Sequence, residues 1–88
     1  MFQIFYTAEA KERLVEIAKS DAKSARIIFD HIKRLPDTYR TDPFLQGSNF
    51  KGLRRNRIGR YRFIYKVLER EKEIRVITVD LRKSIYER

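Results

Sequence analysis

Along the chain, the spacing of apolar residues changes from the two-residue period of a strand to the helical period and back. Residues 2–6 alternate, which predicts a short opening strand with one side made of Phe2, Ile4 and Tyr6. A helix is predicted from Ala8 to about Lys19, with Thr7 as its N-cap, because the apolar residues there share one helical stripe. The members of that stripe are Ala10, Leu14, Ile17 and Ala18.

A second helix is predicted after the polar break at residues 19–21. Its apolar stripe consists of Ala25, Ile28, Phe29, Ile32 and Leu35. We expect this helix to end at Pro36, because proline lacks the N–H group that a continuing helix uses. The short break predicts an antiparallel helical hairpin. His31 lies off the apolar stripe, beside Asp30, which predicts a surface position without a chemical role.

The remaining chain predicts a long loop followed by three strands. Residues 36–49 contain the turn-forming residues Asp37, Asp42, Pro43, Gly47 and Ser48 and show no clear period, which predicts a loop. A loop of fourteen residues is more often functional or mobile than a simple turn. Strands are predicted over residues 52–56, 60–68 and 73–81, with turns near residues 57–59 and 69–72. The order β-αα-βββ predicts a single α+β domain over residues 1–88, with the helical hairpin on one face of a largely antiparallel sheet.

Composition limits the chemistry that such a domain performs. Its 88 residues form one small core, which excludes most folds that bind large cofactors. The chain has no cysteine and one histidine, so we expect no disulfide, no metal centre and no cofactor. Together with the lack of any apolar run long enough to span a bilayer, this predicts a soluble cytoplasmic protein that does not bind membranes.

Positive charge is concentrated in one segment. The formal net charge is +9, and residues 51–66 hold seven basic and no acidic side chains. Five of those seven are arginines, whose planar guanidinium group binds phosphate through two parallel hydrogen bonds. Such an array, held in place by folding, predicts binding to nucleic acid more than to a membrane surface.

Alternation in the predicted strands assigns these charges to a face of the sheet. The aromatic residues Tyr61, Phe63 and Tyr65 are expected beneath the helices, which turns Arg60, Arg62 and Lys66 toward the open face. Arg55 and Arg57 also share one side of their strand. We therefore expect an exposed arginine cluster on the open face. An ion pair between Arg62 and Glu73 across a hairpin is the alternative.

An arginine face of this kind is compatible with metal-free RNA cleavage. The protein would orient the 2′-OH for in-line attack and stabilise the charge that develops on the phosphate. Arginine stays protonated and is a poor base. Tyr86 is a candidate acid or base, since nearby cations favour its phenolate form. The residues alone support nucleic-acid binding and leave cleavage open.

Three pieces of sequence, in this order and spacing, resemble the RelE/ParE toxin superfamily and its RelE branch in particular. They are Lys51-Gly52-Leu53, the run from Arg55 to Tyr65, and the run from Val79 to Tyr86. The match in element order covers the whole chain. The resemblance implies the toxin of a toxin–antitoxin pair, a messenger RNA endonuclease that enters the ribosomal A site and cuts the codon there. It also implies a small antitoxin as partner, which we expect to be acidic or partly disordered.

The same resemblance implies roles for individual residues. Arg62 is expected to bind the scissile phosphate, Arg82 to lie near the leaving group, and Tyr86 to act on the nucleophile or stack on a base. Arg55 and Arg57 occupy two basic positions at which the RelE pattern has lysine. General contacts with RNA phosphates are expected from Lys51, Arg54, Arg60 and Lys83.

Two other functions remain open at the level of sequence. The ParE branch, which is implied to share the fold, consists of non-enzymatic inhibitors of DNA gyrase. A plain RNA-binding module without catalysis would use the same basic face.

Overall fold

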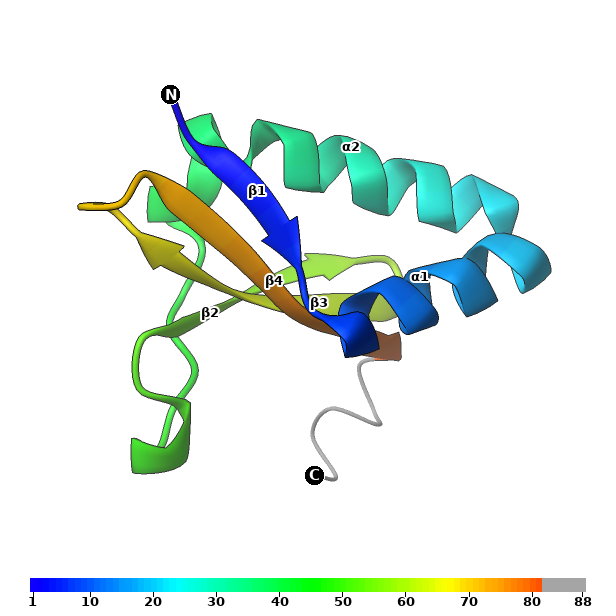
Figure 1. The fold of residues 1–88 in the computed structure, drawn as a ribbon. Helices are drawn as coiled ribbons and strands as arrows, with labels where there is room; N and C mark the ends of the chain where they lie inside the picture. Colours follow the sequence, from blue (N-terminus) through cyan, green and yellow to red (C-terminus); the bar gives the residue numbers. More distant parts are fainter. Residues whose placement is uncertain (82–88) are drawn as a thin grey trace.

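In the computed structural model of this protein, residues 1–81 are described (Figure 1). The predicted site residues Arg82, Lys83 and Tyr86 lie outside that range. The described elements are β1 (Gln3–Tyr6), α1 (Ala8–Ser20), α2 (Ala22–Thr38), β2 (Leu53–Ile58), β3 (Tyr61–Leu68) and β4 (Glu73–Leu81), with 3₁₀ turns at Tyr39–Thr41 and Ser48–Phe50. The predicted α+β order β-αα-βββ is confirmed.

The strands of the described range form one sheet in the order β1-β4-β3-β2. β1 runs parallel to β4, whereas β4 pairs with β3 and β3 with β2 in antiparallel fashion. The two helices form a hairpin that lies over one face of this sheet (Figure 1). The sheet is therefore largely antiparallel with helices on one side, as predicted.

The hydrophobic core lies between the helical hairpin and the sheet. Tyr61, Phe63 and Tyr65 of β3 are all buried there, as predicted from alternation. They pack against one stripe of each helix and against Ile74, Val76 and Val79 of β4. Removal of this apolar surface from water is the main term that stabilises the fold. Two residues of the predicted stripes, Ala18 and Phe29, are instead exposed at the margins of the helices.

Pro36 does not end the second helix as predicted. α2 continues to Thr38, and the N–H of Tyr39 still donates to the carbonyl of Leu35. A proline removes its own N–H bond and crowds the preceding turn. Only Asp37 and Thr38 follow Pro36 in α2, and the loss is small compared with the burial of Leu35 and Tyr39 in the core.

The predicted loop is also partly ordered against the sheet. After the 3₁₀ turn, the chain runs antiparallel to the edge of β2, and Phe44 forms a bridge with Arg54. The N–H of Leu45 donates to the carbonyl of Leu53 at 2.8 Å. This segment, coloured green in Figure 1, continues past the sheet before it enters β2. One edge of the sheet is thus covered by the chain's own backbone.

The turn between β2 and β3 is shorter than predicted. β2 continues to Ile58, which pairs with Tyr61, so only Gly59 and Arg60 form the turn. Gly59 has a φ of 57°, and a two-residue hairpin turn of type II′ requires glycine at this first position. The predicted strand end near Asn56 was wrong because Arg57 and Ile58 still have partners on β3.

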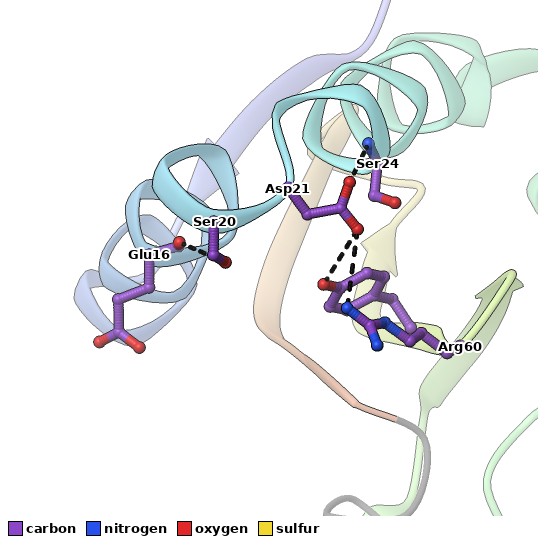
Figure 2. Close-up of polar contacts among 6 residues, drawn as sticks. Glu16, Ser20, Asp21, Ser24 and Arg60 are labelled. Carbon is purple, nitrogen blue, oxygen red and sulfur yellow. Dashed lines mark hydrogen bonds and ion pairs between the residues drawn. The ribbon is translucent and has the colours of Figure 1, made fainter.

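Asp21 joins the helical hairpin to this turn (Figure 2). Its carboxylate caps α2 by accepting the N–H of Ser24 at 3.2 Å, and it lies 3.9 Å from the guanidinium of Arg60. The hydroxyl of Tyr61 donates to the same carboxylate at 3.4 Å. The bonds from Ser24, then those from Tyr61 and the charge of Arg60, hold the pKa of Asp21 below its usual value.

We predict that Asp21→Ala lowers the melting temperature by about 5 °C at pH 7, because the helix cap is lost. A folded-state pKa below the unfolded value means that the carboxylate stabilises the fold above its unfolded pKa of about 3.9. That contribution is lost as the pH falls through the lower folded pKa. Thermal unfolding of both proteins from pH 7 to pH 2 should therefore show the difference shrinking at acidic pH. Asp30→Ala, at an exposed site in the same helix, should change little.

Candidate nucleic-acid interface

The sheet face turned away from the helices carries arginines in register. Arg57 on β2 lies opposite Arg62 on β3, and Arg62 lies opposite Asp80 on β4. The next row across the sheet consists of Arg55, Ile64 and Thr78, and the one after it of Leu53, Lys66 and Arg75. Arg55, Arg57 and Arg62 therefore share one face, as alternation predicted.

A β-bulge in β4 changes what this face presents. Ile64 pairs with Thr78 and Tyr65 with Val76, so Ile77 is left as an extra residue between them. The bulge keeps Val76 and Val79 in the core while both Ile77 and Thr78 line the opposite face. The hydroxyl of Thr7 donates to the carbonyl of Ile77 at 2.5 Å, which ties the bulge to the start of α1.

Arg62 is not exposed as predicted. Its side chain is 1% exposed, whereas Arg55 is half-buried and Arg57 is exposed. A residue in a central strand has neighbours on both sides, and here these are Arg57 and Asp80. The alternative partner Glu73 lies at the far end of β4, where its carboxylate binds Arg75 at 3.0 Å. The proposed ion pair between Arg62 and Glu73 is therefore wrong.

A cavity of about 480 Å³ opens on the same face. β2 and the segment before it contribute Leu45, Gln46, Phe50, Leu53 and Arg55. β3 and β4 contribute Arg62, Ile64, Ile77 and Thr78, and the start of α1 contributes Glu9. The lining is mostly apolar and includes two arginines. The face predicted to carry an exposed arginine cluster thus also contains an apolar cavity.

Only Arg55 and Arg62 of this lining were predicted as site residues. The unusual length of the segment 36–49 was a signal that its residues, among them Leu45 and Gln46, have a role. Nothing in the sequence pattern indicated the bulge that brings Ile77 and Thr78 to the cavity.

A chain of hydrogen bonds anchors this segment to the inner face of the sheet. The carboxylate of Asp42 accepts from the side-chain amide of Asn56 at 3.0 and 3.1 Å and from the hydroxyl of Tyr65 at 2.6 Å. The side-chain oxygen of Asn56 lies 3.2 Å from Nδ1 of His31. Because that oxygen can only accept, Nδ1 of His31 carries the proton. His31, predicted to lie on the surface, is instead half-buried and links α2 to β2.

Tyr65 remains a donor in this network. Burial raises the pKa of Tyr65 well above its usual value, and its bond to Asp42 raises the pKa further. The hydroxyl of Tyr65 therefore keeps its proton at neutral pH. The network thus holds the segment that forms one wall of the cavity by bonds to buried groups.

Arg54 lies on the helix side of the sheet, opposite the face of Arg55. Its guanidinium group donates to the carbonyl of Asp42 at 2.8 Å and lies 3.9 Å from the centre of the Phe44 ring. The ring of Tyr39 is 5.5 Å away. The structure thus separates Arg54, a predicted RNA contact, from the cluster of Arg55, Arg57 and Arg62 on the opposite face.

The other predicted RNA contacts lie at the periphery. Arg60 follows Gly59 in the turn and reaches toward Asp21 (Figure 2), so the expectation that it shares the face of Arg62 is wrong. The turn ends the alternation on which that expectation rested. Lys51 is exposed, directly after the 3₁₀ turn Ser48–Phe50.

Within residues 1–81, no three side chains of His, Asp or Glu are grouped as ligands for a metal ion. No described helix has the length and apolar character needed to cross a membrane.

Comparison with known proteins places this geometry in a family. Residues 4–86 match the family model described as ParE toxin of type II toxin–antitoxin system. No curated protein matches. The match to the family model confirms the resemblance to the RelE/ParE superfamily.

Solved structures share the fold over nearly the whole chain. The YoeB/ParE toxin from Agrobacterium tumefaciens is 20% identical with a TM-score of 0.79, over 91% of this chain and 98% of that one. YafQ from Escherichia coli BL21(DE3) is 19% identical with a TM-score of 0.74, over 98% and 99% of the two chains. The toxin–antitoxin complex RelBE2 from Mycobacterium tuberculosis is 22% identical with a TM-score of 0.65, over 92% and 98%. At this identity they establish the shared fold.

We predict that Asp42→Ala destabilises the protein by about 2 kcal/mol, because it leaves Tyr65 and Asn56 without their acceptor. Urea unfolding measures this. Asp37→Ala, an exposed carboxylate near the end of α2, is the control and should shift the unfolding free energy by less than about 0.5 kcal/mol. Equal effects of the two substitutions would contradict the role of the network.

Proposed function

This chain belongs to the family of ParE toxins of type II toxin–antitoxin systems. From the geometry of its sheet face, and from its resemblance to the RelE branch of the same superfamily, we propose that it cleaves messenger RNA on the ribosome. The observation that carries the proposal is the arginine cluster of Arg55, Arg57 and Arg62, which lies on one face of the sheet beside a cavity. Cleavage would proceed by attack of a ribose 2′-OH on the adjacent phosphate, which forms a 2′,3′-cyclic phosphate. The bond from phosphorus to the 5′ oxygen of the next nucleotide breaks; the 2′-OH loses its proton, and the departing 5′ oxygen gains one.

The three arginines differ in their exposure to solvent, and we assign a different role to the exposed one than to the two that line the cavity. Arg57 is exposed and is available to attract the RNA backbone. Arg55 and Arg62 line the cavity, and Arg62 is removed from water. A charge in such surroundings interacts more strongly with a phosphate that gains negative charge, and one such donor is worth about 10² to 10³ in rate.

Groups other than arginine have to accept and donate the protons, because arginine stays protonated. We assign it to Tyr86 and place Arg82 near the leaving oxygen, with Lys83 as a phosphate contact. These three residues lie outside the described range, and their roles follow from the resemblance.

The proposed toxin acts with three partners: a cognate antitoxin, the ribosome and messenger RNA. The similar RelBE2 from Mycobacterium tuberculosis is a toxin–antitoxin complex. For this chain, with a net charge of +9, an acidic and partly disordered antitoxin segment is the complementary partner.

We predict that the wild-type protein cuts messenger RNA in ribosomes that hold a defined A-site codon, as mapped by primer extension. Arg55→Ala should slow cleavage by about 10², because one donor to the phosphate is removed. Arg26→Ala removes the same charge from an exposed site on α2 and should leave the rate unchanged. Intact messenger RNA at stoichiometric wild-type protein would overturn the proposed activity.

The second candidate function is inhibition of DNA gyrase without catalysis. It is favoured by one observation, the match to a family model named for ParE. A supercoiling assay with the same protein preparation separates the two functions. Inhibited supercoiling together with intact messenger RNA would establish the second in place of the first.

Binding to RNA should depend strongly on salt. If about five phosphates are neutralised on single-stranded RNA, the logarithm of the binding constant falls against the logarithm of salt concentration with a slope of about −3.5. Fluorescence anisotropy with a labelled oligonucleotide at several salt concentrations measures this slope. A flat response would remove phosphate binding from every RNA-based function, including that of a non-catalytic RNA-binding module.

A further inference from the structure

In the proposed function, the arginine cluster binds phosphate, but the apolar part of the cavity has no role. Its walls include Leu45, Phe50, Leu53, Ile64 and Ile77, together with Arg55 and Arg62. Its volume of about 480 Å³ lies within the range of small-molecule sites and is large enough for one nucleotide. An aliphatic ligand would not use the two cations, whereas a nucleotide combines an apolar ring with a phosphate.

Phe50 is positioned to offer an aromatic face. Its side chain is 41% exposed although it lines the cavity. Two glycines with positive φ, Gly47 at 103° and Gly52 at 81°, bracket its 3₁₀ turn, and the N–H of Phe50 donates to the carbonyl of Gly47 at 3.1 Å. A Cβ at Gly47 would lie 3.5 Å from the Phe50 ring, so the ring packs close to bare backbone. An exposed ring held in this way suits stacking on a base.

Thr78 provides a second, independent observation. Its hydroxyl oxygen is buried, and among residues 1–81 it has no hydrogen-bond partner. The bulge in β4 directs Thr78 to the cavity, where the side-chain amide of Gln46 also lies. A buried hydroxyl without a partner is costly, and a polar ligand edge would satisfy it.

We propose that this cavity binds one unstacked nucleobase of single-stranded RNA. The base stacks on Phe50, its polar edge meets the hydroxyl of Thr78, and the adjoining phosphate lies on Arg55 and Arg62. The inference rests on the proposed function for the identity of the ligand as RNA. It adds a site for base recognition next to the phosphate at which cleavage takes place.

The test compares ribose 5-phosphate with the four nucleoside 5′-monophosphates in NMR titrations of the full chain. At least one nucleotide should bind about tenfold more tightly than ribose 5-phosphate, which lacks the base. Phe50→Ala should abolish that advantage and leave the affinity for ribose 5-phosphate unchanged. The matched control is Phe44→Ala, an exposed phenylalanine of the same segment that stacks on Arg54 away from the cavity. It should keep the advantage.

Thr78→Val tests recognition of the base edge, because valine keeps the shape and strand preference of threonine but lacks its hydroxyl. We expect the differences among the four nucleotides to fall at least threefold while stacking persists. Cooperative urea unfolding checks that the variant is folded. Equal affinity of the wild type for ribose 5-phosphate and all four nucleotides would overturn the site. Unchanged base preference in Thr78→Val would overturn the assigned role of its hydroxyl.

Failure of this inference is distinguishable from failure of the proposed function. Ribosomal cleavage by the wild type without any advantage of a nucleotide over ribose 5-phosphate would remove the base site alone. An advantage that Phe50→Ala abolishes, in a protein that leaves ribosome-bound messenger RNA intact, would remove the nuclease activity and support the base site.

Discussion

The burial of three aromatic side chains of β3 beneath the helices is the constraint on which the rest of this structure depends. Tyr61, Phe63 and Tyr65 alternate along one strand and all lie in the core. Because successive residues of a strand point to opposite faces, their burial directs Arg62 and Ile64 to the other side. Pairing with β2 then places Arg55 and Arg57 in register with them. The charge array is thus a geometric consequence of core packing.

Two local departures from regular structure turn that face into a site with depth. The bulge in β4 brings Ile77 and Thr78 onto it, and the segment before β2 adds a wall that includes Leu45 and Phe50. That wall is held from the inner side of the sheet by the network around Asp42. The two faces of the sheet are therefore coupled, since a polar anchor on one supports an apolar hollow on the other.

The resulting surface combines two kinds of affinity that act over different distances. In the proposed function, the net positive charge attracts RNA over about a Debye length, and salt weakens this attraction. In the proposed base site, the apolar cavity acts only on contact and would distinguish a base from bare backbone. A toxin of a toxin–antitoxin system with this face would approach its target by charge and select a nucleotide by shape, while the same exposed charge makes it complementary to an acidic antitoxin.

The sequence by itself determined the α+β order, the faces of β3 and the sharing of one face by Arg55, Arg57 and Arg62. These features follow from periods of two and 3.6 residues, which are local properties of the backbone. Only the tertiary structure decided the burial of Arg62, the position of Arg60 and the partners of His31. Each of these depends on which distant segment packs against the residue. The spacing of residues along the chain does not predict such contacts. Only the tertiary structure decided the cavity as well, because a bulge and a covered sheet edge arise only when strands pair.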